Sequence, residues 1–273
     1  MNRDGHSFLI VLYRQKLSKS KTFQTLNSQL MENDHLIIYD NSPESMLDVK
    51  PANLTYFHDE GNTGLAAPYN FAVQQARKRG DQWLTIFDQD TTLPADFNQI
   101  VKTSMRQTAS AVVLAPEVVL ADGKQISPFW IEDALFFHFP AAVSKTRAAI
   151  NSGMSLNLAA FEGTAPIFDR RYPLDFLDYV FFKQLQKAGK ELKEIPVRLT
   201  QELSLNDFRT MSQVRFENFQ RTEARFVAEF YPRFIPQYRR RLCFRLIKQL
   251  LKRAQWSKLK VIIQVIGGGI APS

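Results

Sequence analysis

The segment WLTIFDQD, residues 83–90, is an apolar run that ends in two carboxylates, Asp88 and Asp90. A turn cluster, TTLP at residues 91–94, follows at once. In open α/β folds a buried strand of this kind ends at the carboxyl edge of the sheet, where ligands bind. Two neighbouring carboxylates repel each other unless a cation lies between them, and a hard divalent cation held with a phosphate is the usual arrangement. The alternative is an acidic turn without a ligand, because aspartate is common in turns.

Short apolar runs alternate with helical patterns on either side of this segment. We expect strands at residues 7–13, 35–39, 54–58, 83–87 and 111–115, and helices at residues 18–31, 64–79 and 95–107. Within 64–79 the apolar residues recur at helical spacing. The alternation predicts an α/β fold with a mostly parallel, doubly wound sheet and helices on both faces.

The second half of the chain is less regular. We expect a helix that ends near Ala188, a strand at residues 194–199, and long helices at residues 212–230 and 236–260. Core packing is favoured over a sugar-stacking platform for Phe129, Trp130, Phe136 and Phe137. We predict one domain at residues 1–230 and a basic helical carboxyl-terminal extension at residues 231–273.

The composition indicates a globular chain: 273 residues, of which 45% are hydrophobic and 23% charged. The single cysteine, Cys243, excludes an intramolecular disulfide and fits a reducing compartment. It lies in a helical apolar stripe, where we expect it to be packed and inert. No apolar run approaches the ~20 residues that span a bilayer, and the amino terminus lacks a secretion signal. We therefore expect a cytoplasmic protein.

The net charge of +8 is concentrated at the carboxyl end, because ten lysines and arginines and no acid follow Glu229. Apolar residues recur there at helical spacing, with bases between them. The apolar residues are Cys243, Leu246, Ile247, Leu250, Leu251 and Ala254. A basic amphipathic helix favours the surface of an anionic membrane. The alternatives are nucleic acid, for which no reading motif is recognised, and a helix that packs only on its own domain.

Five segments, taken in order, resemble the family 2 glycosyltransferases, which have the GT-A fold. They are IYDNS at residues 38–42, NTGLA at 62–66 with Asn70, FDQD at 87–90, NSG at 151–153 and LDFLD at 174–178. The nearest likeness is to the bacterial rhamnosyltransferase branch, which transfers rhamnose from dTDP-rhamnose. It covers roughly residues 7–230, and the order and spacing of the segments make it stronger than any one segment.

The resemblance implies roles for particular residues. Asp90 would coordinate the Mg²⁺ or Mn²⁺ that bridges the diphosphate, and Asp88 would contact that metal or the ribose. Asp178 would be the catalytic base, with Asp175 in reserve. The implied substrate-binding residues are Tyr13, Asp40, Asn41, Asn62, Gly64, Asn70, Asp88 and Gly153. Among these, Asp40 would contact the nucleotide base.

One departure from the family concerns the metal. Its members usually carry a metal-binding histidine after the last strand, whereas residues 201–204 here read QELS, with Gln201 at that position. A glutamine oxygen is a weak ligand for a hard cation, so the resemblance implies a looser metal site.

Several assignments have a structural alternative. Asp178 could cap the helix that follows it, because aspartate favours such positions. Asp40 could serve only the turn at residues 41–43, and Asn62 and Gly64 could be turn residues that bind no ligand.

The implied chemistry is sugar transfer with inversion. A cation stabilises the departing nucleoside diphosphate, and one carboxylate takes the proton of the acceptor hydroxyl. A single base without a nucleophile inverts the anomeric carbon. We predict a glycosyltransferase that moves a sugar, expected to be rhamnose, from a dTDP- or UDP-sugar to a lipid-linked or polysaccharide acceptor in cell-surface polysaccharide synthesis, at the inner face of the membrane. The rival is a catalytically impaired protein that binds sugar nucleotides or polyanions; no nucleic acid is expected as partner.

Overall fold

The computed structural model describes residues 2–108, 110–202, 211–251 and 255–267. The chain forms two compact units. Unit 1 is Met1–Phe129 with Arg147–Glu202, and unit 2 is Trp130–Thr146 with Leu203–Ser273. The division at residue 230 into a catalytic domain and a carboxyl-terminal extension stays a proposal.

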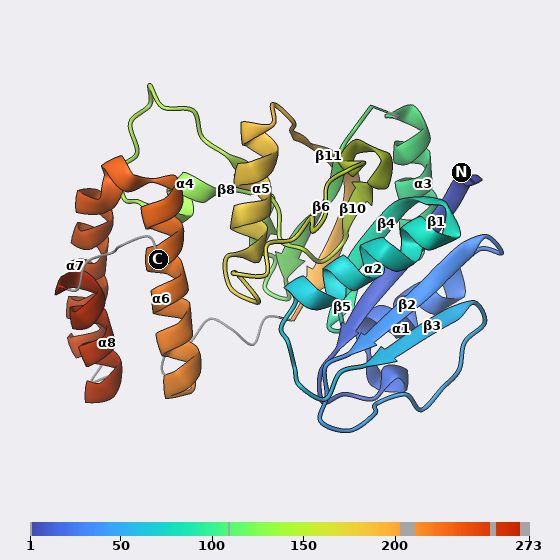
Figure 1. The fold of residues 1–273 in the computed structure, drawn as a ribbon, viewed down its shortest axis with the longest axis horizontal. Helices are drawn as coiled ribbons and strands as arrows, with labels where there is room; N and C mark the ends of the chain where they lie inside the picture. The colour runs from blue at the N-terminus through green and yellow to red at the C-terminus, as the bar shows by residue number, and fades with distance from the viewer. Residues whose placement is uncertain (1, 109, 203–210, 252–254, 268–273) are drawn as a thin grey trace. The chain divides into compact units, whose positions relative to one another are not determined.

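Unit 1 is built on one large sheet, with strands in the order β3-β2-β1-β4-β10-β6-β11-β5 and β7 paired with β6 (Figure 1). The strands are β1 (Asn2–Leu12), β2 (Asp34–Asp40), β3 (Leu54–His58), β4 (Asp81–Asp88), β5 (Thr91–Thr92), β6 (Val113–Leu120), β7 (Gln125–Ser127), β10 (Met154–Asn157) and β11 (Leu192–Gln201). Two short strands, β8 (Phe129–Trp130) and β9 (Arg147–Ala148), form a separate pair.

The sheet is mostly parallel. Strands β3, β2, β1 and β4 run in one direction. Strand β10 is antiparallel to both β4 and β6, which makes β6 and its parallel neighbour β11 run in the same direction as β4. The short β5 is antiparallel to β11. The predicted α/β fold with a mostly parallel sheet is therefore confirmed.

Helices cover the central strands of unit 1, because these strands are apolar on both faces. The helices are α1 (Lys21–Leu26), α2 (Ala66–Arg79), α3 (Phe97–Gln107) and α5 (Leu177–Lys187), with short 3₁₀ turns η1 (Leu17–Lys19), η2 (Asn27–Gln29) and η3 (Leu158–Phe161). Phe8 and Ile10 of β1 belong to one core cluster with Phe23 of α1 and Phe97 of α3. Their neighbour Leu9 is also fully buried. Successive side chains of a strand point to opposite faces, so β1 is buried on both.

The strand register brings two predicted site residues to one edge. Leu12 of β1 pairs with Asp40 of β2, and Val11 of β1 pairs with Asp88 of β4. The two aspartates therefore flank the carboxyl end of β1. Gln201 ends β11 and pairs with Thr91, just after the Asp88–Asp90 segment.

Unit 2 is mainly helical. It contains α4 (Ile131–Leu135), α6 (Gln213–Phe230), the 3₁₀ turn η4 (Pro232–Phe234), α7 (Ile235–Leu251) and α8 (Trp256–Gly267). Ser212 caps α6 by accepting a hydrogen bond from the Arg215 amide. The Tyr231 hydroxyl donates to the buried Glu132 carboxylate of α4, which also accepts from the Thr146 amide at 2.8 Å. Among the described residues, no helix is both long enough and apolar enough to cross a bilayer.

The structure corrects the expected helix at residues 18–31. That stretch is three short pieces, η1, α1 and η2. Ser20 interrupts it with an extended backbone, because its hydroxyl accepts from the Phe23 amide and donates to the Gln89 carbonyl at 2.8 Å.

The expected single helix at residues 236–260 is also wrong. The chain forms two helices there, α7 and α8, and residues 252–254, with Ala254 of the expected stripe, lie outside the described part. The Nζ of Lys258 donates to the Met211 carbonyl, next to the start of α6, at 2.5 Å. Cys243, which we expected to be packed, is exposed on α7.

Candidate active site

The Asp88–Asp90 turn is held by hydroxyl groups from two other segments. The Thr22 hydroxyl donates to the Asp88 carbonyl and accepts from the Thr91 amide at 3.0 Å. The Ser152 hydroxyl accepts from the Asp88 amide at 3.1 Å and lies 2.6 Å from the Thr91 hydroxyl. The backbone between the two carboxylates is therefore fixed before any ligand binds.

The side-chain amide of Gln201 lies within hydrogen-bonding distance of the carboxylates of Asp88 and Asp90. Its Nε2 lies 3.1 Å from Oδ2 of Asp88 and 3.5 Å from Oδ1 of Asp90. The side chain is buried, and its Oε1 has no hydrogen-bond partner among the described residues. Burial and the charge of Asp90 raise the pKa of Asp88 to about 6. The two carboxylates are partly buried and repel each other, so a cation between them would be favoured.

Asp178 lies near this pair, at the start of α5. Burial, with smaller contributions from Asp175 and Asp88, raises its pKa to about 7. Tyr69 of α2 is fully buried, and its pKa is raised well above the ordinary value by burial and then by the charges of Asp88 and Asp178. The charges of both carboxylates thus act on one tyrosine, so β4, α2 and α5 lie close together here.

Asp178 is not the cap residue of α5, although it does bind the start of that helix. The cap position of α5 is Phe176, whose φ of 63° is left-handed and whose side chain makes no cap bond. Asp178 lies in the first turn and accepts from the Tyr179 amide at 2.9 Å. One carboxylate oxygen is therefore bound to the start of the helix. This hydrogen bond lowers the pKa of Asp178, but burial raises it by more.

Asp40 is fully buried and bonded to its own turn. Its carboxylate accepts from the Ser42 amide at 3.1 Å, the Met46 amide at 2.7 Å and the Tyr56 hydroxyl at 2.8 Å. Burial first, and then the neighbouring Asp40 charge, raise the pKa of Tyr56 to about 12. The turn-stabilising role considered for Asp40 is present, and its contact with a nucleotide base stays a prediction.

Tyr13 and Asn41 lie beside Asp40 at the same edge. The Gln89 side chain makes two hydrogen bonds with the backbone of Tyr13. It accepts from the Tyr13 amide at 2.8 Å and donates to the Tyr13 carbonyl at 3.2 Å. The Tyr13 ring itself is exposed. Asn41 donates from Nδ2 to the Gly64 carbonyl at 2.7 Å, and its buried Oδ1 has no partner among the described residues.

Gly64 lies between Asn41 and the segment that leads to Asp178. Its φ is +82°, and a Cβ there would lie 2.4 Å from the Pro173 carbonyl oxygen. The amides of Leu65 and Ala66, at the start of α2, both donate to that carbonyl, at 2.5 and 3.2 Å. Both amides are therefore bonded to the protein itself. Asn62, with φ 44°, is exposed in the turn before them.

Asn70 and Gly153 serve the scaffold in this structure. Asn70 is buried, donating from Nδ2 to the Ala66 and Phe168 carbonyls and accepting from the Phe168 amide. Gly153, with φ +86°, would place a Cβ 2.5 Å from Cδ1 of Leu199. Both residues keep neighbouring segments at close range, and their contacts with a nucleotide stay predictions.

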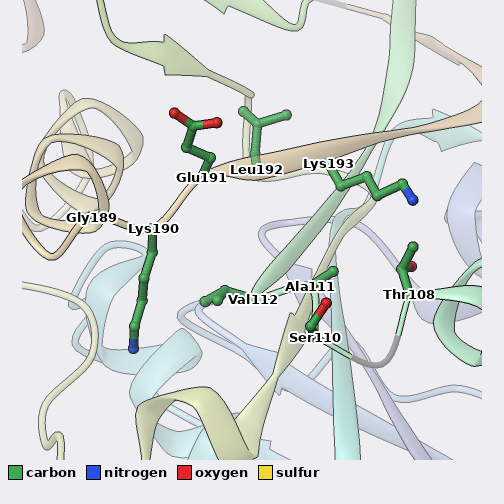
Figure 2. A pocket seen from close by; sticks show the side chains of 9 residues that line it. All are labelled: Thr108, Ser110, Ala111, Val112, Gly189, Lys190, Glu191, Leu192 and Lys193. Carbon is green, nitrogen blue, oxygen red and sulfur yellow. The ribbon is translucent and has the colours of Figure 1, made fainter.

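A shallow pocket of about 430 Å³ lies away from these residues (Figure 2). It is lined by Thr108, Ser110, Ala111, Val112, Gly189, Lys190, Glu191, Leu192 and Lys193. Lys190 and Glu191 point in opposite directions in it. The pocket lies where β6 and β11 begin, whereas the aspartates and Gln201 lie where the parallel strands end. It is therefore not part of the candidate site.

Comparisons with known proteins agree with this geometry. Residues 7–155, more than half of the chain, match the sequence profile of glycosyl transferase family 2. The chain belongs to that family. The predicted family is confirmed, and the rhamnosyltransferase branch stays a prediction.

This family 2 glycosyltransferase shares its fold with solved structures of S. aureus TarS. The structure of TarS 1-349 superposes with a TM-score of 0.51 at 16% identity, covering 96% of this chain and 81% of that one. The complex of TarS 1-349 with UDP-GlcNAc gives a TM-score of 0.50 at 13% identity over the same shares. At such identities the likeness shows the fold alone. No curated protein sequence matches the chain.

The side chains of this glycosyltransferase fit a hard divalent cation. Asp88 and Asp90 offer carboxylate oxygens, and Gln201 has a buried amide oxygen without a partner. Carboxylate and amide oxygens are ligands that Mg²⁺ accepts, and rotation of the amide would exchange its oxygen and nitrogen. No group of three or more histidine, cysteine, aspartate or glutamate side chains arranged for a metal occurs among the described residues.

Sequence reasoning missed several residues of the site. Tyr69 lies in no motif, whereas Gln89 lies within FDQD and Ser152 within NSG; only the fold shows that all three are close to the carboxylates. Lys21 and Glu202 form an ion pair whose charges act on the pKa of Asp90 in opposite directions, Lys21 lowering it. A signal for Gln89 was present in the sequence, since it lies between Asp88 and Asp90.

Proposed function

We propose that this protein is an inverting glycosyltransferase with Asp178 as its catalytic base. The observation that supports this most is the proximity of Asp178 to Asp88, because two segments 90 residues apart in sequence bring two acids of raised pKa to one place. Sites that pair a carboxyl of raised pKa with an anion-binding group are suited to proton transfer during group transfer.

The donor side of the reaction belongs to Asp88, Asp90 and Gln201. A cation bound by their oxygens would act as a Lewis acid on the diphosphate. Asp90 and Gln201 would hold that cation, and the Asp88 turn, fixed by Thr22 and Ser152, would keep the carboxylates in place without rearrangement. Tyr13, Asp40 and Asn41 would bind the nucleoside at the neighbouring strand ends. Asn62 and Gly64 would border it.

The acceptor side belongs to Asp178. With a pKa of about 7 it is ionised in a large share of molecules near neutral pH and can take the proton of an acceptor hydroxyl. Asp175, whose charge contributes to that pKa, is the reserve candidate. Because no second carboxylate is required as a nucleophile, the proposed mechanism has one displacement and inverts the anomeric carbon.

The donor is proposed to be a dTDP- or UDP-sugar, with rhamnose as the first candidate. The resemblance of the motifs favours dTDP-rhamnose, and TarS 1-349 has been solved in complex with UDP and with UDP-GlcNAc. The acceptor is proposed to be a lipid-linked or polysaccharide hydroxyl in cell-surface polysaccharide synthesis. A basic carboxyl-terminal region fits an enzyme that works on the cytoplasmic side of an anionic membrane.

A two-stage experiment tests the proposal. Thermal shift against dTDP-, UDP- and GDP-sugars, with and without Mn²⁺, first identifies the donor. Release of the nucleoside diphosphate from that donor is then compared between the natural chain and Asp178→Asn. Loss of release with retained donor binding supports the assignment. Donor binding with no release by the natural chain, across water and glycan acceptors, would instead favour the catalytically impaired binding protein.

A further inference from the structure

Helix α7 buries one polar side chain, Gln249, and leaves four large apolar side chains exposed. Tyr238 and Gln249 are buried with Leu242. The exposed fractions of Phe244, Ile247, Leu250 and Leu251 are 53%, 53%, 50% and 81%. A helix that only packs on its own protein has the opposite arrangement. We call these four residues the outer stripe.

A buried ion pair fixes this orientation. Arg245 of α7 donates to both oxygens of Glu223 on α6, at 2.5 and 2.9 Å. The Tyr238 hydroxyl donates to the same carboxylate at 2.9 Å. Rotating α7 to bury the outer stripe would break this pair and leave a charge buried without its partner, which is strongly unfavourable. The outer stripe is therefore exposed as a consequence of packing inside unit 2.

Bases border the outer stripe along the helix. At about 100° per residue, the stripe occupies a sector of about 120° of α7. Arg239 lies at one border of the sector, Lys248 just beyond the other, and Arg240 within it; all three are exposed. Trp256 and Ile263 are exposed on one side of α8, 61% and 46%, with Lys260 between them.

We propose that the outer stripe of α7 docks on the surface of an anionic lipid bilayer. An apolar sector between bases matches helices that lie in the headgroup region, where the apolar side chains reach the acyl boundary and the bases meet lipid phosphates. Nucleic acid would attract the bases but would leave the leucines and Ile247 without an apolar partner. A second copy of the chain would bring the same bases together in a symmetric contact. The biological reason for lipid binding rests on the proposed function, since a lipid-linked acceptor would explain why the enzyme binds lipid.

The test uses the full chain and two kinds of vesicle, one of phosphatidylglycerol and phosphatidylcholine in equal parts and one of phosphatidylcholine alone. The natural chain should float with the anionic vesicles, and this binding should weaken as salt rises. The triple variant Ile247→Ser, Leu250→Ser, Leu251→Ser should bind them at least about tenfold more weakly. The matched control is Val214→Ser, an equally apolar and 70% exposed position on α6 of the same unit, which should bind like the natural chain.

The charge arm uses Arg239→Gln, Arg240→Gln and Lys248→Gln. Each should weaken binding to anionic vesicles about fivefold at low salt. Circular dichroism and the melting temperature should be unchanged in all variants, because the altered side chains are exposed.

The proposal is overturned if the triple variant floats as well as the natural chain. It is also overturned if neither the natural chain nor any variant binds vesicles. In that case, loss of self-association by the triple variant in sedimentation velocity would indicate a second copy as partner, and loss of a gel shift would indicate nucleic acid. Nucleotide-sugar affinity is measured in parallel. It should be the same in the triple variant, so a failure of the lipid inference and a failure of the proposed transferase activity give different results.

Discussion

The amide of Gln201 lies between two carboxylates, with its Nε2 3.1 Å from Asp88 and 3.5 Å from Asp90. This amide places partial positive charge between two acids that repel each other, which is part of what a cation would do there. A donor that brings a cation must compete with the amide or turn its oxygen toward the metal. The strength of the proposed metal binding would therefore depend on the Gln201 side chain.

Gln201→His should strengthen the Mn²⁺ dependence of nucleotide binding. An imidazole binds transition-metal ions better than an amide does, so the gain in affinity on adding Mn²⁺ should rise by about tenfold or more. Calorimetric titration with the nucleoside diphosphate, with and without Mn²⁺, measures it. Gln201→Ala is the control and should show no such rise. An unchanged Mn²⁺ dependence in the histidine variant would mean that residue 201 does not face the cation.

Asp90→Ala should abolish turnover and remove any gain in nucleotide affinity from Mn²⁺, because it removes the proposed cation ligand. Asp96→Ala is a matched control, since it deletes one negative charge six residues later at an exposed helix start where the side chain makes no cap bond. That variant should keep full activity. Metal-dependent binding that survives in Asp90→Ala would remove Asp90 from the metal site.

Asp178→Asn should lower transfer by at least ~10²-fold while donor binding is retained. Asparagine keeps the shape and can still accept from the Tyr179 amide, but it cannot take a proton at neutral pH. Asp175→Asn should be milder. If Asp175→Asn stops transfer and Asp178→Asn does not, the base is Asp175, and normal transfer by both variants would place the base outside this segment.

The activity should rise with pH through an apparent pKa of about 7, because the base must be ionised. Stability should change in the opposite direction. A carboxyl whose pKa is raised on folding stabilises the protein fully below its unfolded pKa, and this contribution is lost as pH rises through the folded value of about 7. Asp178→Asn should therefore melt at a higher temperature than the natural chain at pH 8, and the difference should shrink toward pH 4. Melting curves at both pH values, taken without ligand, check this.

Gly153→Ala should destabilise unit 1 by about 2 kcal/mol or more, since its Cβ would overlap side chains of two strands. The contacts would be 2.5 Å to Leu199 and 2.7 Å to Pro116. Gly163→Ala is the control, because Gly163 has a similar positive φ of +72° with nothing within 4 Å of the added Cβ. The difference in denaturation free energy between the two variants isolates packing from backbone strain. Equal losses would mean that strain alone requires glycine at residue 153.

The sequence predicted the sheet well because its strands are short apolar runs that end at turn residues. The expected strand at residues 54–58 coincides with β3, and the expected helices at 64–79 and 95–107 differ from α2 and α3 by two residues at their starts. It failed at residues 18–31, because Ser20 forms a long-range bond to the Gln89 carbonyl that no local pattern reveals.

By itself, the sequence determined the chemistry of the site residues. Asp88 and Asp90 could be selected because acids that follow an apolar strand reach the edge of a parallel sheet, whereas Asp178 was selected by the resemblance of its segment to the family. Only the tertiary structure decided what surrounds them. The burial of Tyr69, the Gln201 amide between the acids and the outward stripe of α7 depend on contacts between residues distant in sequence. Such contacts set the electrostatic environment and the exposed face, and a periodic pattern along the chain contains neither.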